Sequence, residues 1–456
     1  MKKLIILSLV VLITQAGYSQ TSLSLQECRE MALQNSVKMK NARLDVLAAS
    51  ARKEEALAEY FPKVSVNSFG FMAVDPLLEV GVKDILGEST FSSNLQQIVD
   101  YFGEQFGFPS TYTALQYGYT ASVSALQPLY AGGRIVNGNR LAALGQEASL
   151  LKNDIAVRDV MSGIDSDYWK VVALEEKMGV LEASELFLGN LYEDVSEAVS
   201  AGLALDSDLM QVELRRNELR KLRLSLTGGL RLAKMNLFNS IGQPYSLVAD
   251  VSDSLKPFID AVMLSDRLTD LRPPNEYYAP AEEIVSGLSE TRLLDMSVEG
   301  KKLERKMAMG EALPQIGIGA SYGYTQAINS RFNGIVFASV KIPLSDWGKT
   351  SRRMQRLGYE ISKAQNDREY LKGQLLLKVD KLWLDVTLAW EGVLLAGDDM
   401  ELASVTAGRV QDQYEAGLAT LSDLLQARMQ LRTRTDAYLE ARSGYASALA
   451  AYLLER

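Results

Sequence analysis

Two stretches of this sequence are copies of one pattern, and the spacing between the copies is constant. Segment 127–134 (QPLYAGGR) recurs in outline as 342–349 (IPLSDWGK), and segment 201–204 (AGLA) recurs as 416–419 (AGLA). The difference between 342 and 127 is 215, and the difference between 416 and 201 is the same. Neither copy has therefore gained or lost a net residue between its two motifs.

A constant length over such a distance is typical of long packed helices. Removing one residue from a helix rotates everything beyond it by about 100° and moves the buried stripe away from its partner. The sequence from Arg134 to Gly202 contains no proline and is rich in Ala, Leu, Glu, Lys and Asp. At 1.5 Å per residue it makes a helix of roughly 100 Å. We therefore expect long helices at about 134–201 and 349–416.

Shorter helical segments complete each copy. The long helices are followed by helices from Leu205 to about Gly242 and from Leu421 to the end, each about half as long. The missing halves are predicted at Leu25–Tyr60, with Ser24 as N-cap, and at Ala281–Leu313.

Each repeat thus reads as a short helix, a β-hairpin, a long helix and a second short helix. We predict the following organisation: a signal peptide at 1–19, a first repeat at 20–242, a connecting segment at 243–280 that forms a belt around the middle, and a second repeat at 281–456.

Prolines delimit the two hairpins. Pro62 and Pro314 follow the first short helices, and Pro128 and Pro343 precede the long ones, where a residue without an N–H marks the change between helix and strand. Alternating residues predict strands at about 63–73, 113–127, 314–326 and 334–343.

Two parts of the hairpins fit this pattern poorly. In the first strand Val64 and Val66 have the opposite parity to Phe69 and Phe71, so we expect either a bulge or a short strand. Residues 73–112 show no clear strand and read as a long loop that could hold a short helix near Leu95–Phe102.

The strands have one apolar, tyrosine-bearing face and one face of small neutral residues. A soluble sandwich usually has a charged outer face, so this pattern favours a barrel with lipid outside and water inside over a sandwich. Four strands are too few to close such a barrel, and closure would need several copies of the chain. The predicted fold is mainly α-helical, with a membrane β-barrel continued by a helical cylinder.

Composition limits the possible chemistry. Lys2 and Lys3, an apolar run from Leu4 to Ile13 and small residues near Ser19 indicate a secretory signal peptide. Its removal would change the net charge from −9 to −11, which argues against nucleic-acid binding. The absence of His rules out a Ser-His-Asp triad and the commonest metal ligand, and no nucleotide-binding glycine motif is present. We expect no enzyme activity, cofactor or metal. Cys28 is expected to be a small apolar residue on a helix, and Asp398-Asp399 a solvated pair.

Taken together, the motifs resemble the TolC family of outer-membrane channel proteins, over nearly the whole mature chain. The resemblance rests on the order and spacing of a few segments, which are 24–28 (SLQEC) with 32–35 (ALQN), 127–129 (QPL) with 132–134 (GGR), 342–344 (IPL) with 348–349 (GK), 414–418 (YEAGL) and 422–427 (SDLLQA). It implies a homotrimer with one twelve-stranded barrel, continued by a helical cylinder across the periplasm.

The resemblance also implies roles for individual residues near the glycines. Four residues would lie at a periplasmic tip where an adaptor protein docks: Gly202, Leu203, Gly417 and Leu418. Three would belong to a periplasmic gate: Asp208, Tyr414 and Asp423. Ala419 and Gln426 stand where the best-studied member has an arginine and an acid, so this gate should have fewer charge-assisted bonds and be less cation-selective.

The implied function is an outer-membrane exit duct of a tripartite efflux pump or type I secretion system, extending into the periplasm. Its partners would be further copies of the chain, a periplasmic adaptor, an inner-membrane transporter and outer-membrane lipid. The alternative is a periplasmic coiled-coil scaffold or adaptor without a pore, in which the hairpins would form a small soluble β domain.

Overall fold

The structure is a computed structural model that describes residues 22–75, 78–106, 112–114, 117–247, 258–268, 271–326 and 331–456. The predicted signal peptide lies outside these ranges. The chain divides into two compact units. The helical unit comprises 1–48, 147–296 and 366–456, and the strand unit comprises 49–146 and 297–365. The chain passes between the units at four places, and each of them lies inside a helix.

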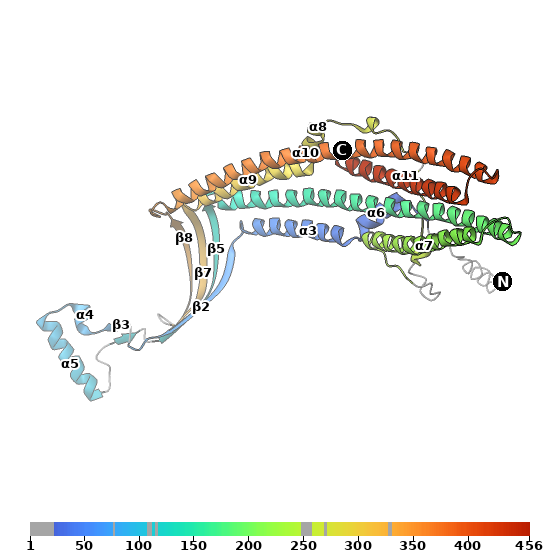
Figure 1. Ribbon diagram of the computed structural model, residues 1–456. Helices are drawn as coiled ribbons and strands as arrows, with labels where there is room; N and C mark the ends of the chain where they lie inside the picture. The colour runs from blue at the N-terminus through green and yellow to red at the C-terminus, as the bar shows by residue number, and fades with distance from the viewer. Residues whose placement is uncertain are drawn as a thin grey trace, which may run out of the picture. The chain divides into compact units, whose positions relative to one another are not determined.

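Two helical hairpins dominate the helical unit. Helix α6 (Arg134–Ser200) is followed by α7 (Asp206–Ser240), and α10 (Lys349–Glu415) by α11 (Leu421–Glu455) (Figure 1). Both α6 and α10 have 67 residues, and both α7 and α11 have 35. The equal lengths confirm the prediction from the constant spacing. Among the residues described, no helix combines the length and the hydropathy that a membrane crossing requires.

The first short helix of each repeat is broken, and the expected single helices at 25–60 and 281–313 were wrong. Ser36 has extended backbone between α2 (Leu25–Asn35) and α3 (Val37–Ala58), and its hydroxyl accepts a hydrogen bond of 3.3 Å from the Met39 N–H. A side-chain acceptor of this kind competes with helix continuation.

In the second repeat Leu288 is extended in the same way between α8 (Ala281–Gly287) and α9 (Ser289–Gly310). Such breaks depend on one residue's backbone angles, which helical composition does not reveal.

The start of the first repeat is held by a helix cap and by packing around one buried tyrosine. Ser24 forms the predicted N-cap of α2, as a capping box with Glu27. Behind it, Tyr168 of α6 is fully buried where β1 (Ser22–Leu23) pairs in parallel with β6 (Met263–Leu264). The described part of the segment between the repeats also contains two 3-10 helices, η1 (Ile259–Ala261) and η2 (Pro274–Tyr277).

The strand unit contains one four-stranded antiparallel sheet. Its order is β2 (Lys63–Met72), β5 (Tyr117–Ala131), β7 (Gln315–Thr325) and β8 (Arg331–Lys341) (Figure 1). The first repeat supplies β2 and β5, and the second supplies β7 and β8. The two repeats therefore meet at the β5–β7 pair, which leaves β2 and β8 as the sheet edges.

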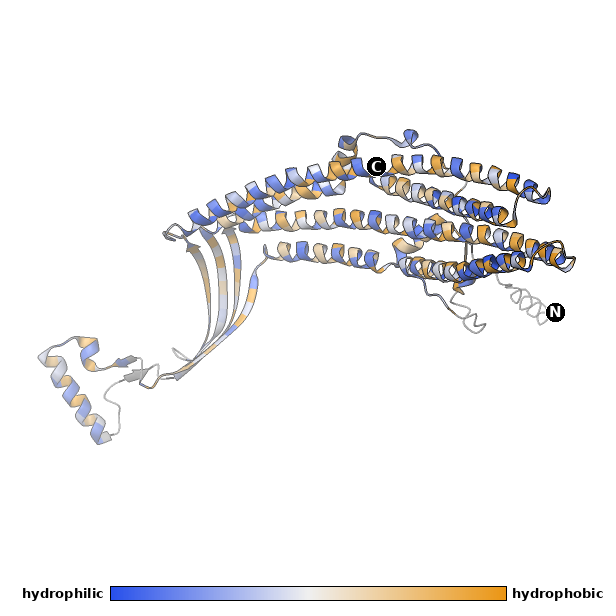
Figure 2. Cartoon of the chain, viewed as in Figure 1, coloured by the Kyte–Doolittle hydropathy of each residue, from blue (hydrophilic) through white to orange (hydrophobic). Residues whose placement is uncertain are grey.

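Large apolar side chains of the sheet are exposed. Hydrophobic positions recur along the strands in Figure 2, and examples on the edge strands are Val66, 76% exposed, and Val336, 85% exposed. The register of β2 on β5 is continuous from Lys63↔Leu126 to Met72↔Tyr117. The parity change at Phe69 and Phe71 therefore reflects neither a bulge nor an early end of the strand.

Two expectations about the first hairpin were wrong. Pro128 does not end its strand, because β5 continues to Ala131 through a register shift between Pro128 and Tyr130, where a missing N–H is tolerated.

The expected loop at 73–112 contains β3 (Leu78–Val80), α4 (Val82–Leu86), α5 (Thr90–Phe106) and the start of β4 (Tyr112–Ala114), with β3 and β4 paired. The short helix expected at Leu95–Phe102 is part of the longer α5. Leu115, which we placed in a strand, lies outside the described residues.

Candidate gate and docking tip

The two turns that join the helical hairpins have the same construction. Gly202 has φ +72° and Gly417 has φ +71°. The Leu203 N–H donates to the Ala198 carbonyl at 2.8 Å and the Gly202 N–H to that of Val199 at 3.0 Å. These two bonds define a Schellman motif, in which glycine supplies the left-handed conformation that ends a helix. Gly417 and Leu418 make the equivalent bonds to Tyr414 and Gln413.

Each glycine is followed by an exposed leucine. Leu203 is 83% exposed and Leu418 is 80% exposed. The turn hydrogen bonds fix the backbone that leads into each leucine, so both side chains are presented from the end of an ordered turn. Two exposed apolar side chains at repeat-equivalent positions are suited to contact with a partner protein.

The two acids singled out from the sequence cap the return helices. Asp423 Oδ2 accepts hydrogen bonds from Thr420 N at 3.0 Å and Thr420 Oγ1 at 2.6 Å, and Thr420 Oγ1 accepts one from Asp423 N at 3.2 Å. These bonds with Thr420, its side chain first, lower the pKa of Asp423. Asp208 occupies the same position in α7, where its carboxylate accepts a bond of 3.3 Å from Leu205 N. Leu205 has no hydroxyl, so the first-repeat cap is weaker.

Tyr414 lies beside the first hairpin. Burial raises the pKa of the Tyr414 phenol, and the negative charges of Asp208 and then Asp194 raise it further. The structure thus brings Tyr414 and Asp208 near each other, although no hydrogen bond among the described residues joins the two side chains. Asp423 does not join this pair and bonds only to Thr420.

An apolar cluster below the turns connects both hairpins. Its buried members come from α6, α7 and α11, and Tyr414 of α10 packs against it. They are Leu181, Leu188, Leu191, Val195, Val212, Leu219, Leu421, Leu424 and Leu425. We call this set the tip cluster. Leucines of α11 are buried against α6 and α7. A shift of one hairpin along the other would therefore disrupt this packing.

Comparison with known protein families finds a match within the second repeat. Residues 304–452 match the profile of the outer membrane efflux protein family. This segment is similar to outer membrane efflux proteins. The match agrees with the resemblance to the TolC family that the sequence motifs predicted. The matched segment contains Tyr414, Gly417, Leu418 and Asp423.

Solved structures show that the likeness in fold extends over nearly the whole chain. A membrane protein from Pseudomonas aeruginosa is 13% identical with a TM-score of 0.74, covering 95% of this chain and 90% of that one. The CmeC outer membrane channel of Campylobacter jejuni is 13% identical with a TM-score of 0.73, covering 94% and 85%.

The outer membrane protein VceC of Vibrio cholerae is 14% identical with a TM-score of 0.69, covering 94% and 95%. No curated protein matches this chain significantly by sequence. At these identities the similarity is one of fold alone, and it confirms the predicted mainly α-helical fold with a smaller contribution of strands.

Sequence reasoning missed a contact between the matched segment and α6 of the first repeat. The guanidinium of Arg428, on α11, lies 4.2 Å from the centre of the Phe187 ring of α6 and donates a hydrogen bond to Gln411 of α10. Its Nε is buried without a hydrogen-bond partner, and burial lowers the pKa of Arg428. None of the ion pairs among the described residues includes Arg428.

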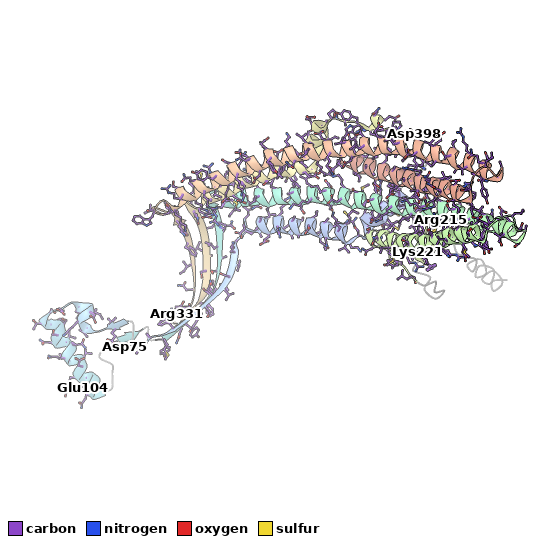
Figure 3. The ribbon with its side chains drawn as sticks, viewed as in Figure 1. Asp75, Glu104, Arg215, Lys221, Arg331 and Asp398 are labelled. Carbon is purple, nitrogen blue, oxygen red and sulfur yellow. The ribbon has the colours of Figure 1, made fainter. Side chains whose placement is uncertain are left out.

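Arg428 also lines a cavity of about 420 Å³ between α6, α7 and α11, together with Leu425 and with Arg215, which is labelled in Figure 3. No motif or periodicity connects residues 187 and 428, so the sequence contained no signal for this contact.

The remaining candidates lie outside the tip cluster. Ala419 N–H donates to the Gln413 carbonyl at 3.3 Å within the turn, and Gln426 is exposed on α11. Asp398 and Asp399 are exposed on α10, as expected; Asp398 is labelled in Figure 3. Cys28 is fully buried, and burial raises the pKa of its thiol to about 12. In the described ranges no group of three or more acidic, Cys or His side chains is placed to hold a metal ion.

Proposed function

We propose that this protein is an outer-membrane exit duct that passively conducts substrates from the periplasm to the exterior. One observation carries the proposal: two helices of equal length each lead from an antiparallel sheet with exposed apolar side chains to a glycine turn with an exposed leucine. Equal lengths allow both turns to reach the same level. The family match favours this function over the pore-less scaffold.

The sheet supports an assembly of several copies. Both edge strands have unpaired backbone groups in the single chain, and an exposed edge is a template for pairing with another chain. We infer a homotrimer in which three sheets of four strands close one barrel, in line with the minimum of eight strands in single-chain barrels. The exposed apolar side chains of the sheet would then face lipid.

The tip supports a docking and gating role. Leu203 and Leu418 would contact the helical hairpin of a periplasmic adaptor, with Gly202 and Gly417 holding them in place. Asp208, Tyr414 and Asp423 would restrict the opening: the first two by their proximity across the hairpins, and Asp423 as part of an acidic lining. The inner-membrane transporter would supply energy and substrate choice, so the duct itself needs no catalytic group, cofactor or metal.

Fractionation and conductance measurements test the proposal. The mature protein should sediment with outer membranes, and in planar bilayers it should form pores of low closed-state conductance. Asp208→Ala combined with Tyr414→Phe should raise that conductance, whereas Asp206→Ala, an acid in the same helix turn but outside the pair, should not. Recovery from the soluble periplasm without pore activity would refute the duct. Unchanged conductance in the double variant would refute only the gate.

A further inference from the structure

The chain contains one complete junction between its two repeats. In it, β5 of the first repeat pairs with β7 of the second, and the turn after β5 lies against the end of α9. The approach is close enough that a Cβ on Gly132 would lie 2.1 Å from the Gly310 carbonyl oxygen. In an oligomer each chain would make a second junction, between the end of its second repeat and the first repeat of the next copy. The single chain shows the geometry of the first junction only.

Corresponding residues of the two repeats can be assigned from the structure. Helices α3 and α9 both have 22 residues, and β2 and β7 begin at Lys63 and Gln315, which differ by 252. Residue n of the α3–β2 part therefore corresponds to n plus 252. From β5 onward the difference is 215, and β8 of the second repeat corresponds to β5 of the first.

We propose that the second junction is formed between copies of this chain, in the register of the first: β8 of one copy pairs with β2 of the next, and Trp347 covers the end of that copy's α3. This inference rests on the oligomeric duct proposed above. It names the residues that face each other in the interface.

The internal pairing specifies the register. Gln127↔Ile318 in the β5–β7 pair becomes Ile342↔Val66 of the next copy, since 127 plus 215 is 342 and 318 minus 252 is 66. By the same rule Val123↔Tyr322 becomes Ala338↔Gly70, and Ala125↔Ala320 becomes Val340↔Ser68.

This register can be checked against side-chain chemistry that was not used to derive it. Val336 and Val340 of β8 and Ile342 just after it share one face of the strand. In this register they lie opposite Met72, Ser68 and Val66, which also share one face of β2. A slip by one residue would instead place Val340 opposite Asn67 or Phe69, on the other face.

Charge is also complementary at the end of the interface. Ala131↔Gln315 becomes Asp346↔Lys63, which places a carboxylate opposite an ammonium group. Asp346 already accepts a hydrogen bond of 2.6 Å from Thr350 N at the start of α10, so its position is fixed.

The turn after β8 has an exposed tryptophan where the turn after β5 has a glycine. Trp347 corresponds to Gly132, and both have positive φ, +55° and +62°. Trp347 is the only non-glycine with positive φ among the described residues, and it is 98% exposed. A left-handed tryptophan is strained, and such strain persists where it serves a site.

The surface that Trp347 would meet is apolar. Gly310 corresponds to Ala58, so the glycine-to-glycine contact of the first junction becomes a tryptophan-to-alanine contact that cannot be as close. The indole instead has room to lie over three side chains beside Ala58 that are exposed in the single chain: Leu57 (52%), Tyr60 (40%) and Phe61 (59%).

Paired cysteines in outer-membrane vesicles test the register. Native Cys28 can remain, because it is buried and its thiol stays protonated. Val340→Cys with Ser68→Cys should be oxidised to a covalent oligomer about tenfold faster than Val340→Cys with Val66→Cys or with Gly70→Cys, because Cα atoms more than about 7 Å apart cannot be bridged without backbone movement. Single-cysteine variants provide the baseline.

The outcomes separate this inference from the duct itself. Fastest oxidation in either slipped pair would overturn the register and leave the oligomer standing. No covalent oligomer in any pair would also overturn it, and the mass of the detergent-solubilised protein would then show whether the oligomer fails too.

A second set of variants tests the tryptophan. Trp347→Gly relieves the backbone strain but removes the indole, so the SDS-resistant oligomer should be lost at a temperature at which the parent and Trp347→Phe keep it. Equal heat resistance of Trp347→Gly and the parent would overturn the role of Trp347.

Discussion

The equal length of the two hairpins can be tested by lengthening one of them. Seven residues inserted after Met178 in α6 and after Leu226 in α7 extend the first hairpin by about 10.5 Å and turn it by only about 20°, because seven residues make nearly two turns. Insertions after Val393 in α10 and after Ala441 in α11 extend the second hairpin in the same way, since each site is 215 positions further on.

The first pair of insertions alone should disturb both the tip cluster and the approach of Asp208 to Tyr414. The whole α6–α7 part of the tip cluster moves past Leu421, Leu424 and Leu425, which are 7%, 1% and 5% exposed in the parent. Each leucine that loses its burial costs about 1.5–3 kcal/mol. Asp208 also moves away from Tyr414 by about a Debye length at physiological salt, so their electrostatic interaction is largely screened.

The assay is closed-state conductance in planar bilayers, with efflux of a fluorescent dye from cells as a second measure. The variant with one long hairpin should conduct more in the closed state and lose efflux, while its circular dichroism still shows a helical protein. The variant with both hairpins lengthened should recover the low conductance. If the single-hairpin variant keeps parental conductance and efflux, equal reach of the two turns is unnecessary and the reasoning is wrong.

Three further predictions concern single residues. Gly202→Ala should lower the free energy of unfolding by about 1–2 kcal/mol, because alanine is strained at positive φ. Gly189→Ala, within α6, should raise the free energy of unfolding by up to about 1 kcal/mol, because alanine favours a helix more than glycine does. Thermal unfolding distinguishes the two variants. The pKa of Asp423 is lowered in the folded protein. The contribution of its cap to stability is therefore complete above the unfolded-state pKa and is lost as the pH falls through the folded-state pKa. The difference in Tm between the parent and Asp423→Asn should vanish in acid. Arg428→Met should be neutral or stabilising in urea titrations because no carboxylate pairs with Arg428, whereas Arg223→Met, which loses Glu185, should be destabilising.

The sequence predicted the regular parts of the fold because periodic packing limits them. The 215-residue spacing indicated matched helices, and α6 and α10 have the expected lengths. The helix break at Ser36 and the continuation of β5 past Pro128 were missed, since both depend on local backbone geometry within an otherwise regular segment.

For the candidate site, the sequence located the residues but not their interactions. The glycine turns and Asp423 follow from local signals, a positive φ and a capping position, that one stretch of sequence contains. The contact of Arg428 with Phe187 joins helices far apart in the chain, and only the packed structure brings them together. The strain at Trp347 was equally hidden, because the aligned motif has glycine at that position in the other repeat.

The four crossings between the compact units have a mechanical consequence. All of them lie inside helices, within α3, α6, α9 and α10, and none lies in a loop. A loop can act as a hinge by rotating a few backbone angles, but a helix bends gradually by stretching hydrogen bonds along its length. Any change in angle between the units must therefore be spread along four helices. Under a force applied at the tip, the protein should bend elastically and gradually rather than rotate at a hinge.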